Sequence, residues 1–154
     1  EVLGLDASEL AIEEARKNAE LNGLSDRVHF EVADVLEWLP RKVEEGVKYD
    51  VVILDPPAFT KSRDTIKKAA KGYREINVCG MKLVRNGGYL ATCSCSHFMD
   101  NDTFMSVIAQ SARSAHKRLR QVEFRTQSAD HPILWSADES YYLKFYIFQV
   151  CEEE

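Results

Sequence analysis

The chain has 154 residues, of which 45% are hydrophobic and 29% charged, and these proportions are ordinary for one soluble domain with a real core. Its apolar runs are too short to span a bilayer, and its first residues lack the pattern of a signal peptide. The net charge of −5 is a weak argument against a nucleic-acid binder, since such proteins usually carry a basic footprint. The four irregularly spaced cysteines favour reduced thiols in a cytoplasmic protein over a disulfide framework.

Short apolar segments alternate with amphipathic helical patterns along the whole chain. In chain order we expect a strand at 2–5, a helix at 9–22, a strand at 28–33, a helix at 35–46 that Pro40 interrupts early, a strand at 49–54, a helix at 65–85, a turn at 86–88, a strand at 89–93, a helix at 101–116, and strands at 122–125 and 141–150. This alternation predicts a parallel α/β sheet with helices on both faces. The last two strands lack a helix between them and therefore predict an antiparallel edge.

Polar or reactive side chains follow four of these strands. Asp6, Asp34 and Asp55 each close one strand, and Cys95 follows another, on the rim opposite Asp55. Ligands of open α/β sheets bind beyond the carboxyl ends of the strands. Asp6 fits the acid that accepts hydrogen bonds from ribose hydroxyls, and Asp34 fits an acceptor for an adenine amino group. Each acid alone could simply cap the next helix, but three together favour a nucleoside cofactor. Ser8 stands at the expected N-cap position of the first helix.

The segments LGLDAS, VADV, YDVVILDPPAF, GYREIN and NGGYLATCSCS follow one another in an order that resembles class I S-adenosylmethionine-dependent methyltransferases. They resemble more closely the bacterial enzymes that make 5-methylcytosine in large-subunit ribosomal RNA, and the later ADHPI and YLKFYIFQV match as well. The resemblance covers nearly the whole chain. It implies that residues 1–154 are a partial catalytic domain with a Rossmann-like sheet. It also implies S-adenosylmethionine as cofactor and ribosomal RNA as substrate, and the short apolar runs and the cysteines predict a cytoplasmic location without a membrane partner.

The resemblance also implies roles for individual residues. Cys95, the middle residue of Ser-Cys-Ser, would be the nucleophile, and Asp55 would lie beside the methyl group and the target base. The implied cofactor-binding residues are Asp6, Ala7, Ser8, Asp34, Val35, Asp55 and Pro56. Carbon 5 of cytosine is a poor nucleophile, so a thiolate that adds at carbon 6 splits one hard step into easier ones.

Other interpretations remain open at this point. A methyltransferase acting on an exocyclic amine or a small molecule would use Asp-Pro-Pro but leave Cys95 without a role. A non-catalytic RNA-binding or assembly module could retain the fold. Cys95 itself could be packed, and packing is the favoured interpretation of Cys79, Cys93 and Cys151. We expect no metal, because Cys93 and Cys95 lack zinc-ligand spacing and a second ligand pair, and His97 stays unassigned.

A basic segment follows Asp-Pro-Pro directly. Its cations could bind phosphates or could form a solvated helix face, and the two interpretations are equally good. They are Lys61, Arg63, Lys67, Lys68, Lys71 and Arg74. Within the family motif, Tyr73 and Asn77 are expected to face the active site. A second basic run at 113–120 is expected to be exposed to solvent.

The chain opens inside the second strand of the family fold. The first strand and its glycine-rich turn would therefore be absent, and in the usual strand order that strand lies between those ending at Asp6 and Asp55. We expect a fragment that closes this gap by rearrangement, by strand exchange in a homodimer, or by pairing with another segment.

Overall fold

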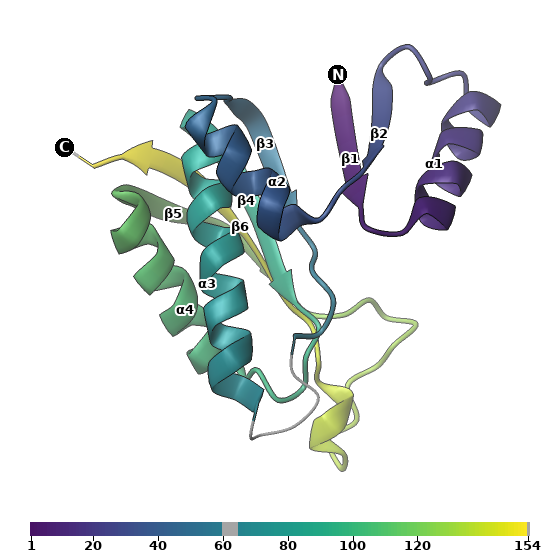
Figure 1. The fold of residues 1–154 in the computed structure, drawn as a ribbon. Coiled ribbons are helices and arrows are strands. Elements are labelled where there is room, and N and C mark those ends of the chain that lie inside the picture. The colour runs from purple at the N-terminus through teal and green to yellow at the C-terminus, as the bar shows by residue number, and fades with distance from the viewer. Residues whose placement is uncertain (60–64, 154) are drawn as a thin grey trace. The chain divides into compact units, whose positions relative to one another are not determined.

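A computed structural model describes residues 1–59 and 65–153 (Figure 1). Lys61 and Arg63, two cations of the first basic segment, lie outside these described residues. The chain divides into two compact units, Glu1–Lys42 and Val43–Glu154. In the described parts of the chain, no helix combines the length and the apolar character that crossing a membrane requires.

The first unit holds two parallel strands and a helix that packs on them. The strands β1 (Val2–Asp6) and β2 (Val28–Val32) pair in register, and α1 (Glu9–Leu21) connects them. Gly4 allows close packing inside the pair, since a Cβ there would come within 2.7 Å of the Phe30 ring. The next helix, α2 (Val35–Glu44), begins in this unit.

The local signals at the ends of these helices act largely as predicted. The Ser8 hydroxyl accepts a hydrogen bond from the Ala11 amide at 3.3 Å and so caps α1. Gly23 follows the end of α1 with φ +64°, a conformation that costs glycine little. The predicted interruption at Pro40 is wrong, because α2 continues through this residue to Glu44.

The second unit is built on a four-stranded mixed sheet. Its strand order is β3-β4-β6-β5, with β3 (Tyr49–Leu54), β4 (Val84–Ser94), β6 (Lys144–Glu152) and β5 (Lys117–Arg125). The first two strands are parallel, whereas β6 is antiparallel to both β4 and β5, which confirms the predicted antiparallel edge.

Two helices of the second unit, α3 (Ile66–Leu83) and α4 (Asn101–Ala115), pack on one face of this sheet (Figure 1). The expectation of helices on both faces of one sheet stays a prediction, because α1 packs on the strands of the first unit. Neither sheet continues into the other by strand pairing among the described residues, since β1 pairs with β2 and β3 pairs with β4.

Two strands begin earlier than the sequence predicts. β4 starts at Val84 and contains the predicted turn at 86–88 as an irregularity, where Gly87 has φ +80°. A Cβ on Gly88 would lie 2.6 Å from the Asp50 carbonyl oxygen, so the strand can approach β3 only with glycine here. β5 starts at Lys117 because its first residues already pair with the end of β6.

The core of the second unit lies between the sheet and its two helices. Alternate residues of β6 point into it, and aromatic rings from three elements meet there. Tyr73 and Phe104 lie 5.5 Å apart edge to face, and Tyr146 stacks on Phe148 at 5.5 Å. Each large apolar side chain buried in this way contributes about 1.5–3 kcal/mol, so this cluster is a principal support of the sheet's inner face.

Candidate active site

The carboxylate of Asp55 is paired with the thiol of Cys93. The parallel register that pairs Leu54 with Thr92, carried one residue further, sets Asp55 beside Cys93. The Cys93 thiol donates to Asp55 Oδ1 at 3.1 Å, and the Leu54 carbonyl oxygen lies 3.6 Å from the same sulfur. We expected Cys95 opposite Asp55, but the contact that the structure describes for this carboxylate is with Cys93.

Cys93 is a packed and protonated thiol. Its residue is only 4% exposed and lies inside β4, as expected for a packed cysteine. Burial raises the pKa of the Cys93 thiol far above its ordinary value, and the hydrogen bond to Asp55 raises it further. This thiol therefore acts as a hydrogen-bond donor that orients Asp55.

Cys95 stands in a different environment, just beyond the strand. β4 ends at Ser94, and Cys95 follows as a half-buried free thiol. The Ser96 amide donates to the Ser94 hydroxyl at 3.4 Å, which closes a tight turn around Cys95. Of the two neighbouring cysteines, Cys95 is thus the one placed in a turn with access to solvent.

The turn is anchored to α3 by two hydroxyl groups. The Ser94 hydroxyl lies 2.9 Å from the Tyr73 hydroxyl, and both residues are fully buried. Burial raises the pKa of Tyr73, and the hydrogen bond with Ser94 opposes that rise. The Phe59 ring, which follows Asp-Pro-Pro, meets the Tyr73 ring edge to face at 4.8 Å. Tyr73 therefore connects the segment after β3 with the end of β4.

Asn77 lies one helical turn beyond Tyr73. Its amide nitrogen donates to the Tyr73 carbonyl oxygen at 2.8 Å, and the residue is fully buried. Its Oδ1 is buried without a hydrogen-bond partner among the described residues. Tyr73 contacts Ser94 at the end of β4, and Asn77 is hydrogen-bonded to Tyr73. That the two residues face the active site stays a prediction.

Lys144 is a residue of this site that the sequence analysis missed. It opens β6, lies opposite Ser94 in the antiparallel register, and is 1% exposed. Its ammonium donates to the carbonyl oxygens of Ser96 at 2.6 Å and Tyr142 at 2.9 Å. A single lysine in phase with the buried aromatic residues of YLKFYIFQV was the available signal, since alternate residues of a strand share one face.

The acids Asp6 and Asp34 of the first unit lie just before helices. Asp6 Oδ1 accepts from the Ser8 amide at 2.7 Å, and Asp34 Oδ1 accepts from the Leu36 amide at 2.8 Å. The capping interpretation therefore holds for Asp34, whereas Asp6 binds the amide of Ser8, which is itself the residue that caps α1. Each of these bonds uses one carboxylate oxygen of an exposed residue, so it leaves room for a ligand at the same carboxylate. Val35 is the first residue of α2, directly after Asp34.

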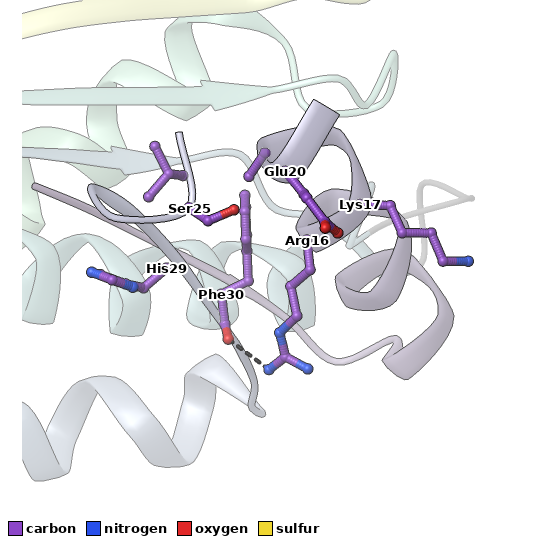
Figure 2. Close-up of a pocket in the computed structure, with 8 residues that line it drawn as sticks. Arg16, Lys17, Glu20, Ser25, His29 and Phe30 are labelled. Atoms are coloured by element: carbon purple, nitrogen blue, oxygen red, sulfur yellow. Dashed lines mark hydrogen bonds between the residues drawn. The ribbon is translucent and has the colours of Figure 1, made fainter. Parts of the chain in front are cut away.

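An open hollow of about 410 Å³ lies between α1 and β2 (Figure 2). The Arg16 guanidinium belongs to its wall and donates to the Phe30 carbonyl oxygen at 2.8 Å. The labelled residues on its wall are Arg16, Lys17, Glu20, Ser25, His29 and Phe30. None of the predicted site residues lines it, and we assign it no catalytic role.

The remaining candidates have simpler environments. All four cysteines are free thiols, and the described residues contain no group of three or more potential metal ligands. His97 is exposed, and the centroid of its ring lies 5.3 Å from the centroid of the Phe98 ring. The described cations of the first basic segment, Lys67, Lys68, Lys71 and Arg74, are exposed on α3.

One prediction about the second basic run is wrong. Lys117 is 8% exposed and forms an ion pair with Glu152, because β5 begins here and lies against the end of β6. Arg113, Arg118 and Arg120 are exposed, as expected.

The fold is that of a Rossmann-like methyltransferase domain, and comparison with known proteins identifies the family. Residues 1–144 match the model of a methyltransferase domain family, and the chain belongs to this family. Ribosomal RNA large subunit methyltransferase I of Erwinia tasmaniensis is 40% identical over 151 residues, which are 97% of this chain and 38% of the relative. The protein of that name from Shewanella denitrificans is 40% identical over 147 residues, 95% of this chain and 37% of the relative. The chain thus spans about two fifths of the length of these relatives.

Solved structures share the fold at low sequence identity. A protein from Streptococcus mutans, assigned as a SAM-dependent methyltransferase, has a TM-score of 0.80 at 18% identity. The similarity covers 96% of this chain and 38% of that one. The N-methyltransferase NodS from Bradyrhizobium japonicum, in complex with S-adenosyl-L-homocysteine, has a TM-score of 0.59 at 12% identity. It covers 96% of this chain and 65% of NodS.

Proposed function

We propose that the protein containing this chain transfers a methyl group from S-adenosylmethionine to carbon 5 of a cytosine in large-subunit ribosomal RNA. Cys95 is the nucleophile of this proposal. The observation that carries it is the half-buried free thiol of Cys95 in a braced turn at the carboxyl end of β4. The names of the curated relatives support the substrate class, and an rRNA substrate implies a cytoplasmic location.

The chain carries residues that fit the cofactor. An exposed carboxylate at the end of β1, with one oxygen on the Ser8 amide, suits a ribose that needs a hydrogen-bond acceptor. We assign the nucleoside to Asp6, Ala7, Ser8, Asp34 and Val35, and the methyl-bearing end to Asp55 and Pro56. When bound, S-adenosylmethionine supplies an electrophilic methyl group on its sulfonium.

The chemistry of the chain's own residues follows from the thiol. The Cys95 thiolate donates an electron pair to carbon 6 of cytosine, and the π electrons of the carbon 5–carbon 6 bond move to carbon 5, which can then accept a methyl group. A base then removes the proton of carbon 5, the double bond forms again, and the sulfur leaves as thiolate. Covalent catalysis of this kind leaves Cys95 unchanged at the end of the cycle.

Asp55 orients the target cytosine in this proposal. Cys93 holds one of its carboxylate oxygens at 3.1 Å, so the other oxygen has a defined direction and can accept from the exocyclic amino group of cytosine. An exocyclic-amine methyltransferase would need Asp55 in a similar way but would have no use for the Cys95 thiol. The two functions therefore differ in their dependence on Cys95.

The test uses the intact protein with S-adenosylmethionine and ribosomal RNA that lacks the modification. Wild type and Cys93→Ala should form 5-methylcytosine, and Cys95→Ser should form none, as measured by nucleoside mass spectrometry. With RNA containing 5-fluorocytosine, which cannot lose a proton from carbon 5, wild type and Cys93→Ala should become covalently attached and Cys95→Ser should not. Formation of 5-methylcytosine by Cys95→Ser would refute the nucleophile, and methylation at an exocyclic nitrogen would favour the amine activity.

A further inference from the structure

Lys144 is a buried cation whose described hydrogen bonds are to neutral groups. Its ammonium has three donors, and two of them reach the carbonyl oxygens of Ser96 and Tyr142. The other buried lysine of this sheet, Lys117, has the carboxylate of Glu152 as its partner. A buried charge is costly unless an opposite charge compensates it, so the question is which negative group compensates the charge of Lys144.

The surroundings of Lys144 contain two groups that can carry negative charge. Burial lowers the pKa of Lys144 to about 8, while the nearby Cys95 and Asp100 act in the opposite direction. The Tyr141 ring also faces the ammonium, with its centroid at 6.0 Å. Asp100 is exposed and accepts from the Thr103 amide at 2.7 Å, which holds it at the start of α4. Cys95 is the less exposed of the two anionic candidates, because Asp100 faces solvent.

We propose that Lys144 is a positioning residue for Cys95, whose ammonium fixes the Ser96 carbonyl and stabilises the thiolate form of Cys95 before it attacks. This inference rests on the proposed function for the role of the thiolate, but the interaction between the two side chains can be tested without any methyl transfer. In this proposal Lys144 contacts neither the cofactor nor the target cytosine. It acts through the backbone of the turn and through its charge.

The antiparallel register explains why the lysine arrives at this position. Ser94, the last residue of β4, is paired with Lys144, the first residue of β6. The side chain therefore rises on the inner face beside the turn, and its ammonium reaches the carbonyl one residue beyond Cys95. An opposite charge close to a thiol favours the thiolate, which is the reactive form.

The first experiment measures the alkylation rate of Cys95 by iodoacetamide at pH 7.5 in the intact protein, without methyl donor or RNA. Mass spectrometry of the peptides separates Cys95 from Cys151, which serves as the internal reference. Lys144→Met should slow Cys95 alkylation about tenfold, and Lys144→Arg should retain most of the wild-type rate. Lys117→Met, the matched control, removes a buried lysine at the other end of the sheet and should leave the Cys95 rate unchanged.

A second variant guards against a failure of Lys144→Met to fold. Asp100→Asn keeps a good helix cap but removes the negative charge that competes for Lys144. At pH 6.5, where the lysine stays protonated in both proteins, Cys95 alkylation should therefore accelerate about twofold. Unchanged Cys95 alkylation in folded Lys144→Met, or slower alkylation in Asp100→Asn, would overturn the proposal.

Methyl transfer separates this inference from the proposed function. Lys144→Met should lower kcat about tenfold with little change in KM for S-adenosylmethionine, since the thiol step is affected and cofactor binding is not. If Cys95→Ser proves fully active, the nucleophile assignment fails, yet the alkylation rates still report whether Lys144 controls this thiol.

Discussion

Replacement of Lys144 by methionine should change how the stability of the fold depends on pH. Methionine has a similar length but no charge, so the substitution removes the titrating group with little change in volume. The ordinary lysine pKa of 10.5 falls to about 8 in the folded chain, chiefly because the side chain is buried. A pKa difference of about 2.5 corresponds to about 3 kcal/mol of free energy of unfolding.

The sign follows from the protons bound by each state. Below pH 8 both states carry the charge, and the folded state bears the full cost of burying it. Between pH 8 and 10.5 the unfolded lysine keeps its proton while the folded one releases it, so the unfolded state binds more protons and stability rises with pH. The stability of the lysine protein relative to Lys144→Met should therefore increase by about 3 kcal/mol across this window.

The assay is urea unfolding followed by circular dichroism at pH 7, 8, 9 and 10. Both proteins carry Cys95→Ser, which removes the neighbouring thiol from the comparison. The free-energy difference between them cancels the contributions of all other groups. A difference that stays constant within about 0.5 kcal/mol, or that changes in the opposite direction, would refute the conclusion that burial dominates the environment of Lys144.

Three further substitutions test the site and its support. Cys93→Ala should lower the free energy of unfolding in urea by about 1–2 kcal/mol, because a packed thiol and its hydrogen bond are lost. Covalent capture of 5-fluorocytosine RNA should persist in this variant. Loss of capture would mean that Cys93 shares the role given to Cys95. Tyr73→Phe removes the hydroxyl that is hydrogen-bonded to the buried Ser94. It should lower the free energy of unfolding by about 1–2 kcal/mol and kcat severalfold. Unchanged values would show that water replaces the phenol hydroxyl. Gly80→Ala would bring a Cβ within 2.8 Å of a methyl group of Leu54. The net loss of about 1 kcal/mol of folding stability should lower Tm. A higher Tm would show that the helix can move away from the sheet.

Local patterns in the sequence were sufficient for much of the fold. The apolar run at 49–54 matches β3 residue for residue, and the cap at Ser8 and the glycine after α1 act as predicted. These features depend on side chains and backbone preferences within a few residues. The pairing between strands depends on residues far apart in the sequence, which is why β4 and β5 began earlier than their patterns suggested.

The candidate site shows the same limit. The sequence supplied Asp55 and the two cysteines but not the register that pairs Asp55 with Cys93 rather than Cys95. A register shift of two residues would place Cys95 instead of Cys93 beside Asp55 on the same face of the sheet, and no local pattern distinguishes these two registers. Lys144 was missed for a related reason, since a lysine in an aromatic strand has no evident function until its neighbour across the sheet is known.

The place of β6 in the sheet has a functional consequence. In an antiparallel pair the start of one strand lies beside the end of the other, so the residues that enter β6 must lie beside the residues that leave β4. Through Lys144 the carbonyl of Tyr142, just before β6, is tied to the carbonyl of Ser96, just after Cys95. The segment that leads into β6 is thereby fixed to the turn that holds the thiol. The antiparallel strand therefore does more than extend the sheet, because it brings a buried cation to the turn that holds the half-buried Cys95 thiol.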